Sequence, residues 1–271
     1  RHCERSEAIQ RSEKDGLPRP WLAVTKCKEL FFMRIIFVRH GHPNYEKDCL
    51  TDLGVLHAKA VAQRLKNDNE PIEKIFSSTC GRALETASFI DSKFGVGVVG
   101  LDFMREIKWG SVDGEPIFDD GHPWNTSNYI VENGGSLLDF DWQKSDLYKN
   151  NKLVSCVEKI GIDFDNWLKD FGYVREGDYY RVGDVKNHTI SLVSHGGASS
   201  AVFSHLFNLP FPFLCSAICP DFTAITIVHF SERKGNLIAP KFELVNDARH
   251  IKNEEFRIKN EELNKKIEFK M

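Results

Sequence analysis

The sequence predicts an α/β fold built around a mainly parallel β-sheet. Short runs rich in β-branched and aromatic residues alternate with longer segments whose apolar residues recur at helical spacing. The longer segments can form crossover connections, which join strands that run in the same direction. Polar residues and glycine directly follow several of the short runs. These residues mark a candidate functional edge, because ligands of parallel sheets bind beyond the carboxyl ends of the strands.

Each element is predicted from its own composition and spacing. Val, Ile, Thr and aromatic residues indicate strands at 34–38, 74–77, 96–99, 189–194, 223–229 and 241–245. Apolar residues at helical spacing indicate helices at 52–66, 81–94, 153–171 and 197–207. Residues 108–150 have no strong period, so we expect an irregular insert that lies over the functional edge and selects the substrate.

The two ends of the chain differ from the segment between them. Residues 1–20 are polar and without apolar period, and Met33 directly precedes the first strand. We therefore expect residues 1–32 to be a disordered or non-native leader and residues 33–250 to form one domain. Residues 251–271 form a charged tail in which IKNEEFR is followed by IKNEELN. The apolar spacing of this repeat is not that of a coiled coil, which favours a solvated tail.

Composition excludes several classes of function. The 271 residues are 41% hydrophobic and carry a net charge of −3, so no general basic field attracts nucleic acid or an anionic membrane. No apolar run approaches the length of a membrane-spanning helix. The seven cysteines are odd in number and form no CxxC pair, which indicates reduced thiols and a cytoplasmic location. The oligomeric state cannot be predicted from these features.

Three strand exits carry residues suited to an anion. Arg39 and His40 follow the first strand, and His195 precedes Gly196 and Gly197 at the start of a helix. Arg82 lies in the first turn of another helix, after the strand at 74–77. A helix amino terminus favours an anion through its free N–H groups, and arginine forms forked hydrogen bonds to phosphate oxygens. Each feature alone is compatible with a structural role, but together they predict a phosphoryl site.

The motifs that carry these residues resemble those of the histidine phosphatase superfamily, the phosphoglycerate mutase-like branch. The matching stretches are FVRHGHPNY, CLTDLGVLHAKAVAQRL, IFSSTCGRALETA, MREIKWGSVDG and LVSHGG, which spread from residue 34 to about residue 207. The resemblance implies a three-layer α/β/α sandwich with a mainly parallel sheet. It also implies that Thr51 and Gly54 belong to a structural helix start.

The resemblance implies roles for individual residues. His40 is expected to be the nucleophile, which is transiently phosphorylated, and Glu106 the proton donor. Arg39, Arg82 and His195 are expected to bind the phosphate, with Asn44 as a further phosphate contact. Positioned arginines stabilise the charge of a phosphoryl-transfer transition state without a metal ion, so we expect no cofactor.

A metal-dependent hydrolase is the main alternative chemistry. His40 and His42 form an HxH pair, and His122 or His195 could complete a metal site. Against this reading, Gly41 ends the strand and no carboxylate motif typical of a metal site lies nearby.

Two further readings keep the phosphate site but change the outcome. A mutase would move phosphate within one substrate, but the insert lacks the basic residues expected around a bisphosphorylated ligand. Its acidic residues favour a phosphomonoesterase whose substrate, a small phosphorylated metabolite, has modest further charge; they are Asp113, Glu115, Asp119, Asp120, Glu132, Asp139 and Asp141. A phosphate-binding module without turnover is the other reading, but His40 and Glu106 are both present.

Trp109, Trp124 and Tyr129 could stack on an aromatic or sugar leaving group, or form the core of the insert.

Overall fold

A computed structural model describes residues 31–185, 188–218, 220–231 and 233–251 of the chain. Their main element is a six-stranded sheet. The sheet order is β11-β9-β1-β8-β4-β5. Its strands are β1 (Phe31–Arg39), β4 (Lys74–Ser78), β5 (Val98–Leu101), β8 (His188–Ser194), β9 (Ile225–Ser231) and β11 (Lys241–Asp247). The predicted leader and charged tail lie, apart from Phe31, Phe32 and Ile251, outside the described residues.

The sheet is mainly parallel, as the sequence predicts. Strands β1, β8, β4 and β5 run in one direction, whereas β9 is antiparallel to both β1 and β11. The parallel neighbours place the carboxyl ends of β1, β8 and β4 side by side at one edge.

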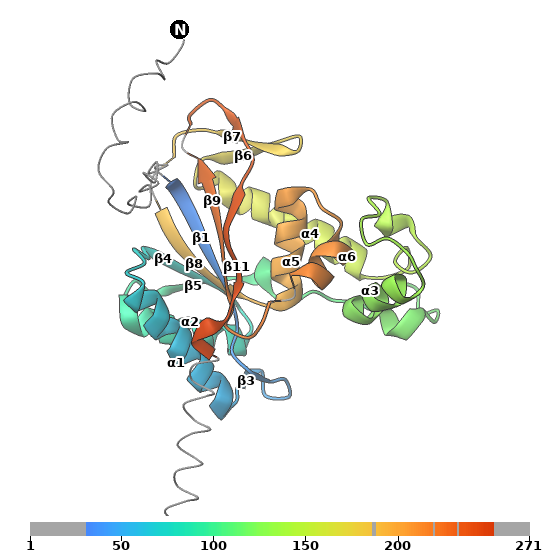
Figure 1. Ribbon diagram of the computed structural model, residues 1–271, viewed down its shortest axis with the longest axis horizontal. Coiled ribbons are helices and arrows are strands. Elements are labelled where there is room, and N and C mark those ends of the chain that lie inside the picture. Colours follow the sequence, from blue (N-terminus) through green and yellow to red (C-terminus); the bar gives the residue numbers. More distant parts are fainter. Residues whose placement is uncertain (1–30, 186–187, 219, 232, 252–271) are drawn as a thin grey trace, which may run out of the picture.

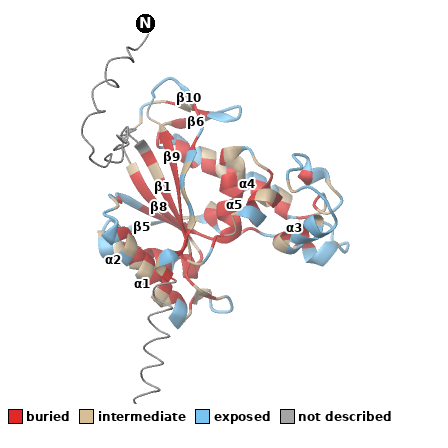
Figure 2. Cartoon of the chain, viewed as in Figure 1, coloured by how far each residue is buried: buried red, intermediate tan, exposed pale blue. Residues whose placement is uncertain are grey.

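Helices cover both faces of the sheet and give the predicted three-layer α/β/α sandwich (Figure 1). Helices α1 (Asp52–Asn67) and α2 (Gly81–Phe94) cover one face, and α4 (Leu153–Lys169) and α5 (Gly196–Phe207) cover the other. Buried residues concentrate on the strands and on the inner sides of these helices (Figure 2). None of the helices in the described part of the chain has the length and apolar character of a membrane span.

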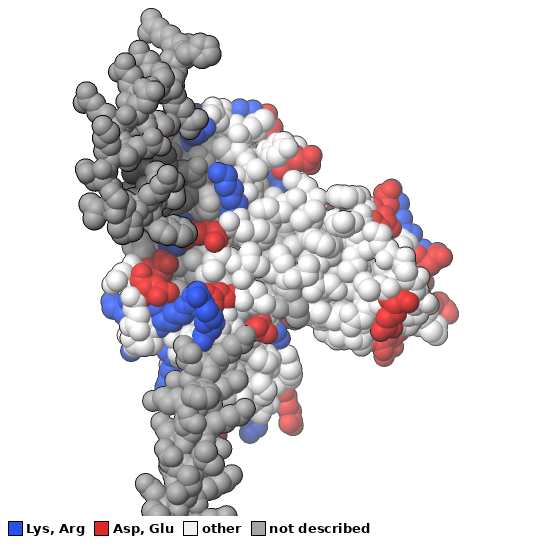
Figure 3. All heavy atoms as spheres, viewed as in Figure 1, with Lys and Arg blue, Asp and Glu red and all other residues white. Residues whose placement is uncertain are grey.

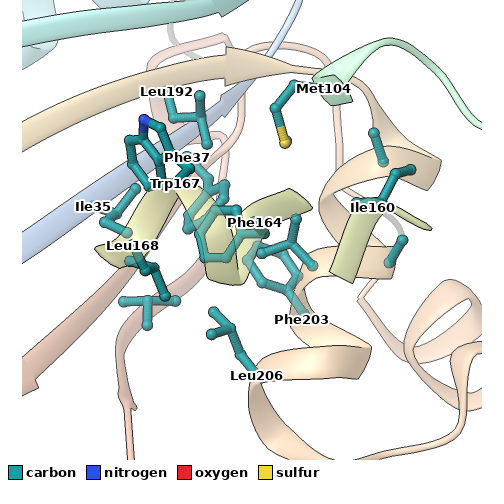
Figure 4. Close-up of a cluster of buried hydrophobic side chains, with 14 of the residues drawn as sticks. Ile35, Phe37, Met104, Ile160, Phe164, Trp167, Leu168, Leu192, Phe203 and Leu206 are labelled. Carbon is teal, nitrogen blue, oxygen red and sulfur yellow. The ribbon is translucent and has the colours of Figure 1, made fainter. Parts of the chain in front are cut away.

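The larger core lies between the sheet and helices α4 and α5, where aromatic side chains gather (Figure 4). The ring of Phe37 on β1 lies 4.9 Å from that of Phe203 on α5, edge to face, and 6.2 Å from that of Phe164 on α4. Such pairs stabilise a core beyond the area that they bury. They fix β1, and therefore the residues that follow it, against the helix layer.

Residues 108–150 are less irregular than expected. They contain α3 (Pro123–Glu132) together with short 3₁₀ helices at Phe118–Gly121 and Trp142–Lys144, and they extend away from the sheet (Figure 1). Helix α3 has ten residues and starts with Pro123, and so short a helix gives little periodic signal. A third 3₁₀ helix, Asp102–Met104, precedes the insert.

Some smaller elements have no counterpart in the sequence prediction. They are α6 (Phe211–Ala217), the sheet of β6 (Tyr173–Glu176), β7 (Tyr179–Val182) and β10 (Leu237–Ile238), and the hairpin of β2 (Pro43–Asn44) and β3 (Cys49–Leu50). Strands of two to four residues are too short to show alternation.

Candidate active site

The predicted phosphate-binding residues meet at one edge of the sheet. Arg39 is the last residue of β1 and His40 follows it, while His195 follows β8 and occupies the N-cap position of α5. Arg82 lies in the first turn of α2, the helix after β4. Since β1, β8 and β4 are neighbours, their exits deliver these four side chains to one place.

Arg82 joins the two histidines. Its Nε lies 3.3 Å from Nε2 of His40, and its Nη2 lies 3.1 Å from Nδ1 of His195. The two imidazole rings are 5.0 Å apart between centroids and meet edge to face. All three side chains are buried. A compact group of one guanidinium and two imidazoles therefore faces the edge of the sheet.

The imidazole of His40 is held in one tautomer. Its Nδ1 lies 2.7 Å from the carbonyl oxygen of Gly41, which can only accept, so Nδ1 carries the proton and Nε2 a lone pair. Burial lowers the pKa of His40 to about 3, helped by the charges of Arg39 and Arg82 and opposed by the bond to Gly41. The ring is neutral at neutral pH, and its free lone pair is a nucleophile.

The turn after β1 needs glycine because it packs directly on the start of α1. A Cβ on Gly41 would lie 2.5 Å from the carbonyl oxygen of Gly54, and a Cβ on Gly54 would lie 2.1 Å from that of His42. The amide of Gly41 donates to Oγ1 of Thr86 at 3.0 Å. Any larger side chain at either glycine would push His40 out of position.

Arg39 is clamped by the loop that precedes β9. Its Nη1 donates to the carbonyl oxygen of Pro220 at 2.6 Å, and its guanidinium carbon lies 4.3 Å from the ring centre of Phe222. The Nε of Arg39 is buried and has no hydrogen-bond partner among the described residues. A buried donor without a partner is costly, so this N–H indicates that an acceptor belongs beside it.

Asp48 orients Arg82 from the side opposite the histidines. Its Oδ1 accepts from Nη1 of Arg82 at 2.5 Å, and its Oδ2 accepts from the amide of Gly81 at 2.8 Å. Burial alone would raise the pKa of Asp48, but the Gly81 amide and the Arg82 guanidinium outweigh it, so the pKa is lowered. The carboxylate is therefore charged and fixes the plane of the guanidinium.

Glu106 lies beside the amino terminus of α5. Its Oε1 accepts from the amides of Ile107 and Ala198, each at 3.0 Å. A Cβ on Gly197 would lie 2.8 Å from this oxygen and 2.3 Å from Cδ1 of Ile107, so a side chain here would displace one or both of these groups. Burial raises the pKa of Glu106, although the two amides and the nearby arginines oppose the shift. Such a carboxyl group can carry a proton at a pH where an exposed one cannot.

His195 has a polar partner on each side of its ring. Its Nε2 lies 2.8 Å from Oγ of Ser78, while Nδ1 faces Arg82. Burial, followed by the charges around it, holds the pKa of His195 well below its usual range. The Ser78 hydroxyl can accept from Nε2 or donate to it, so the neutral ring can present either an acceptor or a donor at Nδ1.

His42 does not join His40. Its Nδ1 lies 2.9 Å from Oγ1 of Thr51, which also accepts from the amide of Gly54 at 3.1 Å and so caps α1. The residues described by the structure contain no group of three or more His, Cys, Asp and Glu side chains that could hold a metal ion. The structural role expected of Thr51 and Gly54 matches this geometry.

Asn44 is bonded within its own hairpin. It is on β2, and its Oδ1 accepts from the amide of Lys47 at 3.1 Å. Within the described part of the chain, no hydrogen bond joins its side chain to Arg39, His40 or Arg82. A phosphate contact from Asn44 therefore remains a prediction.

The acidic residues of the insert lie at its surface. All seven of those named above are exposed. Figure 3 shows acidic atoms at the outer end of the insert and others elsewhere on the same face of the molecule. The aromatic residues divide into two groups: Trp109 and Trp124 gather with His122, whereas Tyr129 pairs with Phe118 at 4.4 Å between ring centroids.

Sequence reasoning missed Asp48 and Ser78. Ser78 is a buried polar residue at the end of β4, which is the same signal that identifies His40 and His195 at their strands. Asp48 gives no such signal, because it lies on a loop and has a left-handed backbone with φ of 47°.

Part of the chain matches a known family. Residues 35–128 match the histidine phosphatase superfamily (branch 1), which confirms over this segment the resemblance that the motifs indicate. Proteins described as probable phosphoglycerate mutase GpmB, from Yersinia pestis (strain Pestoides F) and Yersinia pseudotuberculosis serotype O:1b, are each 32% identical over 94 residues. These matches cover 31% of this chain and 43% of each relative. The chain thus spans less than half the length of the curated relatives that it matches.

Solved structures with the same fold cover more of the chain. A phosphoserine phosphatase mutant from Entamoeba histolytica in complex with phosphoserine has a TM-score of 0.53 at 21% identity, over 80% of this chain and 98% of its own. A mycobacterial glucosyl-3-phosphoglycerate phosphatase has a TM-score of 0.52 at 19% identity, over 79% and 98%. The alpha-ribazole phosphatase from Shigella flexneri has a TM-score of 0.51 at 15% identity, over 80% and 97%. At these identities the similarity establishes the fold.

Proposed function

From the histidine phosphatase match of residues 35–128 we propose that this chain is a metal-independent phosphomonoesterase, which acts on a small phosphorylated metabolite through a phosphohistidine at His40. One observation carries the proposal. A neutral, buried His40 has its lone pair on Nε2, directly beside the donors of Arg82. Structural neighbours are named as phosphoserine, glucosyl-3-phosphoglycerate and alpha-ribazole phosphatases. These names support a small phosphorylated metabolite as the substrate.

In the first step, Nε2 of His40 attacks phosphorus and the bond from phosphorus to the ester oxygen breaks. Before substrate binds, the Nε–H of Arg82 covers this lone pair. Binding must therefore turn the donors of Arg82 toward the phosphate oxygens, together with the buried Nε–H of Arg39. Positive charge at these oxygens stabilises the transition state of phosphoryl transfer.

Two further groups handle protons. Glu106, whose raised pKa favours the protonated form, gives its proton to the leaving oxygen. In the second step Glu106 takes a proton from the attacking water, the N–P bond breaks, and inorganic phosphate leaves with His40 restored. His195 becomes a donor to phosphate when the hydroxyl of Ser78 donates to its Nε2.

A mutase is the second candidate, because the curated relatives are described as probable phosphoglycerate mutases. A mutase and a phosphatase share the phosphohistidine and differ in whether water reaches it. The interconversion of 3-phosphoglycerate and 2-phosphoglycerate, measured beside phosphate release, separates the two. Interconversion that outpaces phosphate release would replace the phosphatase by the mutase.

The test is hydrolysis of an aryl phosphate by the intact protein, by His40→Ala and by His188→Gln, each with and without EDTA. We expect turnover that resists EDTA, is absent in His40→Ala and is unchanged in His188→Gln, since His188 pairs with Glu73 away from the site. Rapid denaturation should trap a phosphoenzyme that is labile in acid and stable in base. Turnover that EDTA abolishes, or that persists in His40→Ala, would contradict the proposal.

A further inference from the structure

Three aromatic side chains of the insert meet next to the phosphate-binding residues. The ring centroids of Trp109 and Trp124 are 6.2 Å apart, with the planes at 86°. His122 lies against both, at 5.2 Å from Trp109 and 5.4 Å from Trp124. We call Trp109, His122 and Trp124 the aromatic wall. Two indoles at right angles form a corner in which a flat group can contact one face and one edge.

The wall lies on the same side of the α5 amino terminus as Arg39. A Cβ on Gly196 would lie 3.7 Å from Cζ and Nε of Arg39 and 3.8 Å from Cζ2 of Trp124. The guanidinium and the indole therefore border the same point in space. The Nε of Arg39 is the buried donor without a described partner, so a phosphate that bonds it would have the wall beside its ester group.

The wall is held in place by a buried side chain. Asn151, 2% exposed, accepts from the amide of Gly110 at 3.2 Å and donates to the carbonyl oxygen of Gly121 at 2.9 Å. Gly110 directly follows Trp109, and Gly121 directly precedes His122. One amide thus ties together the two segments that carry the wall, and a site fixed in this way loses little entropy when it binds a ligand.

Backbone strain beside the wall also indicates a maintained geometry. Asp119 and Asp120 have φ of 45° and 50°, and Gly121 has φ of 76°. Left-handed residues other than glycine are costly and persist where the surroundings impose them. They lead directly into His122, which caps α3 with Nδ1 as acceptor and so keeps its proton on Nε2.

We propose that the aromatic wall binds a flat, ring-bearing leaving group, so that the preferred substrate is a phosphate ester of a ring compound with little charge beyond its phosphate. The proposal rests on the function proposed above. Trp109 is 36% exposed, which leaves apolar ring surface open to a ligand. The indole and imidazole N–H groups can bond polar substituents, and the acidic residues of the insert are exposed rather than part of the wall.

The insert offers a matched control. Phe118 and Tyr129 form a second aromatic pair, 4.4 Å apart, and both are exposed to a similar extent as Trp109. Tyr129→Leu therefore removes a comparable aromatic surface from the insert without removing part of the wall.

The experiment compares Trp109→Leu, Tyr129→Leu and the intact protein on phenyl phosphate, a hexose phosphate and glycerol phosphate. For each substrate the ratio of variant to intact kcat/KM is taken, so intrinsic reactivity cancels. We expect Trp109→Leu to lose about 3- to 10-fold on ring-bearing substrates, mainly through KM, with no loss on glycerol phosphate. The phenyl and hexose arms separate recognition of an aromatic face from that of a sugar face. Asn151→Asp, which keeps the acceptor and removes the donor to Gly121, should reproduce part of the loss.

The inference would be overturned, while the phosphatase activity stands, if Trp109→Leu loses equally on all substrates. It would also be overturned if neither Trp109→Leu nor Asn151→Asp loses activity on the ring-bearing substrates. If the intact protein hydrolyses none of these esters, the proposed function fails instead. Calorimetric binding of phenyl phosphate and glycerol phosphate to the intact protein and to Trp109→Leu then tests the wall alone, with selective weakening of phenyl phosphate expected. If Trp109→Leu does not fold, Asn151→Asp and Tyr129→Leu carry the comparison.

Discussion

The Nε of Arg82 lies 3.3 Å from Nε2 of His40, so the proposed phosphate-binding group covers the lone pair of the proposed nucleophile. The same guanidinium is held from its other side by Asp48. In the proposed mechanism, substrate phosphate competes with His40 for Arg82, and the exchange uncovers the proposed nucleophile only when an acceptor for the guanidinium is present. The orientation of Arg82 would then control both binding and attack.

We predict that Asp48→Asn lowers kcat/KM for phosphate esters by about tenfold, because it removes a charge-assisted hydrogen bond worth about 1.5 kcal/mol or more. Asparagine tolerates the left-handed backbone at this position and can still accept from the amide of Gly81, so the fold should persist. Steady-state kinetics and a thermal melt measure the two effects. Glu46→Gln, an exposed carboxylate on the same hairpin, is the control. An unchanged kcat/KM in Asp48→Asn would show that Arg82 needs no such support.

The pH profile of kcat/KM should report His40 on its acid side and Glu106 on its alkaline side. His40 must be unprotonated to attack, so activity should rise with pH as it passes about 3, the lowered pKa of this imidazole. Glu106 must be protonated to act as acid, so activity should fall as pH rises through its raised pKa. Both pKa values are those of the free enzyme, because the pH dependence of kcat/KM reports the groups of the free enzyme.

Glu106→Gln separates the acid from the other groups that titrate. We expect a loss of about 10²- to 10⁴-fold on alkyl phosphates, whose leaving oxygen needs a proton, and a much smaller loss on nitrophenyl phosphate. The alkaline limb of the wild-type profile should be absent from the variant. Equal losses on both esters would assign Glu106 to phosphate binding or structure instead.

The centre of the site could be predicted because it follows from strand exits. Arg39, His40 and His195 follow short apolar runs, Arg82 opens the helix after the next strand, and β1, β8 and β4 are neighbours in the sheet. The mainly parallel sheet follows from the same alternation of strands and helices, whereas the three-layer sandwich is what the family resemblance implies. Local sequence therefore carries this part of the structure.

The surroundings of the site depend on contacts between distant segments, which a local pattern does not encode. Asp48 reaches Arg82 through a left-handed loop, and Asn151 reaches Gly110 across 41 positions. The sequence left open whether Tyr129 joins Trp109 and Trp124 at a leaving group. In the structure Tyr129 pairs with Phe118 instead.

Thr51 should contribute to stability through its cap of α1. Its Oγ1 accepts from the amide of Gly54, and replacing a threonine cap by alanine costs about 1 kcal/mol. Thr51→Ala should therefore lower the melting temperature by about 2–4 °C. Thr51→Ser retains the hydroxyl and should melt close to the intact protein. A drop of equal size in both variants would assign the effect to the lost methyl group.

The two glycines that open α5 should respond differently to alanine. A Cβ on Gly197 would collide with Ile107 and with Oε1 of Glu106, so Gly197→Ala must displace the carboxyl group. We expect a stability loss of about 1–3 kcal/mol, typical of overpacking, and a larger proportional loss of kcat on alkyl phosphates than on nitrophenyl phosphate. At Gly196 the nearest atoms to a new Cβ are 3.7 Å away, at ordinary contact distance, so Gly196→Ala should melt like the intact protein. Melting curves and kcat on both esters measure the difference. If both variants behave alike, the close approach of Gly197 to Glu106 does not determine the position of the proposed acid.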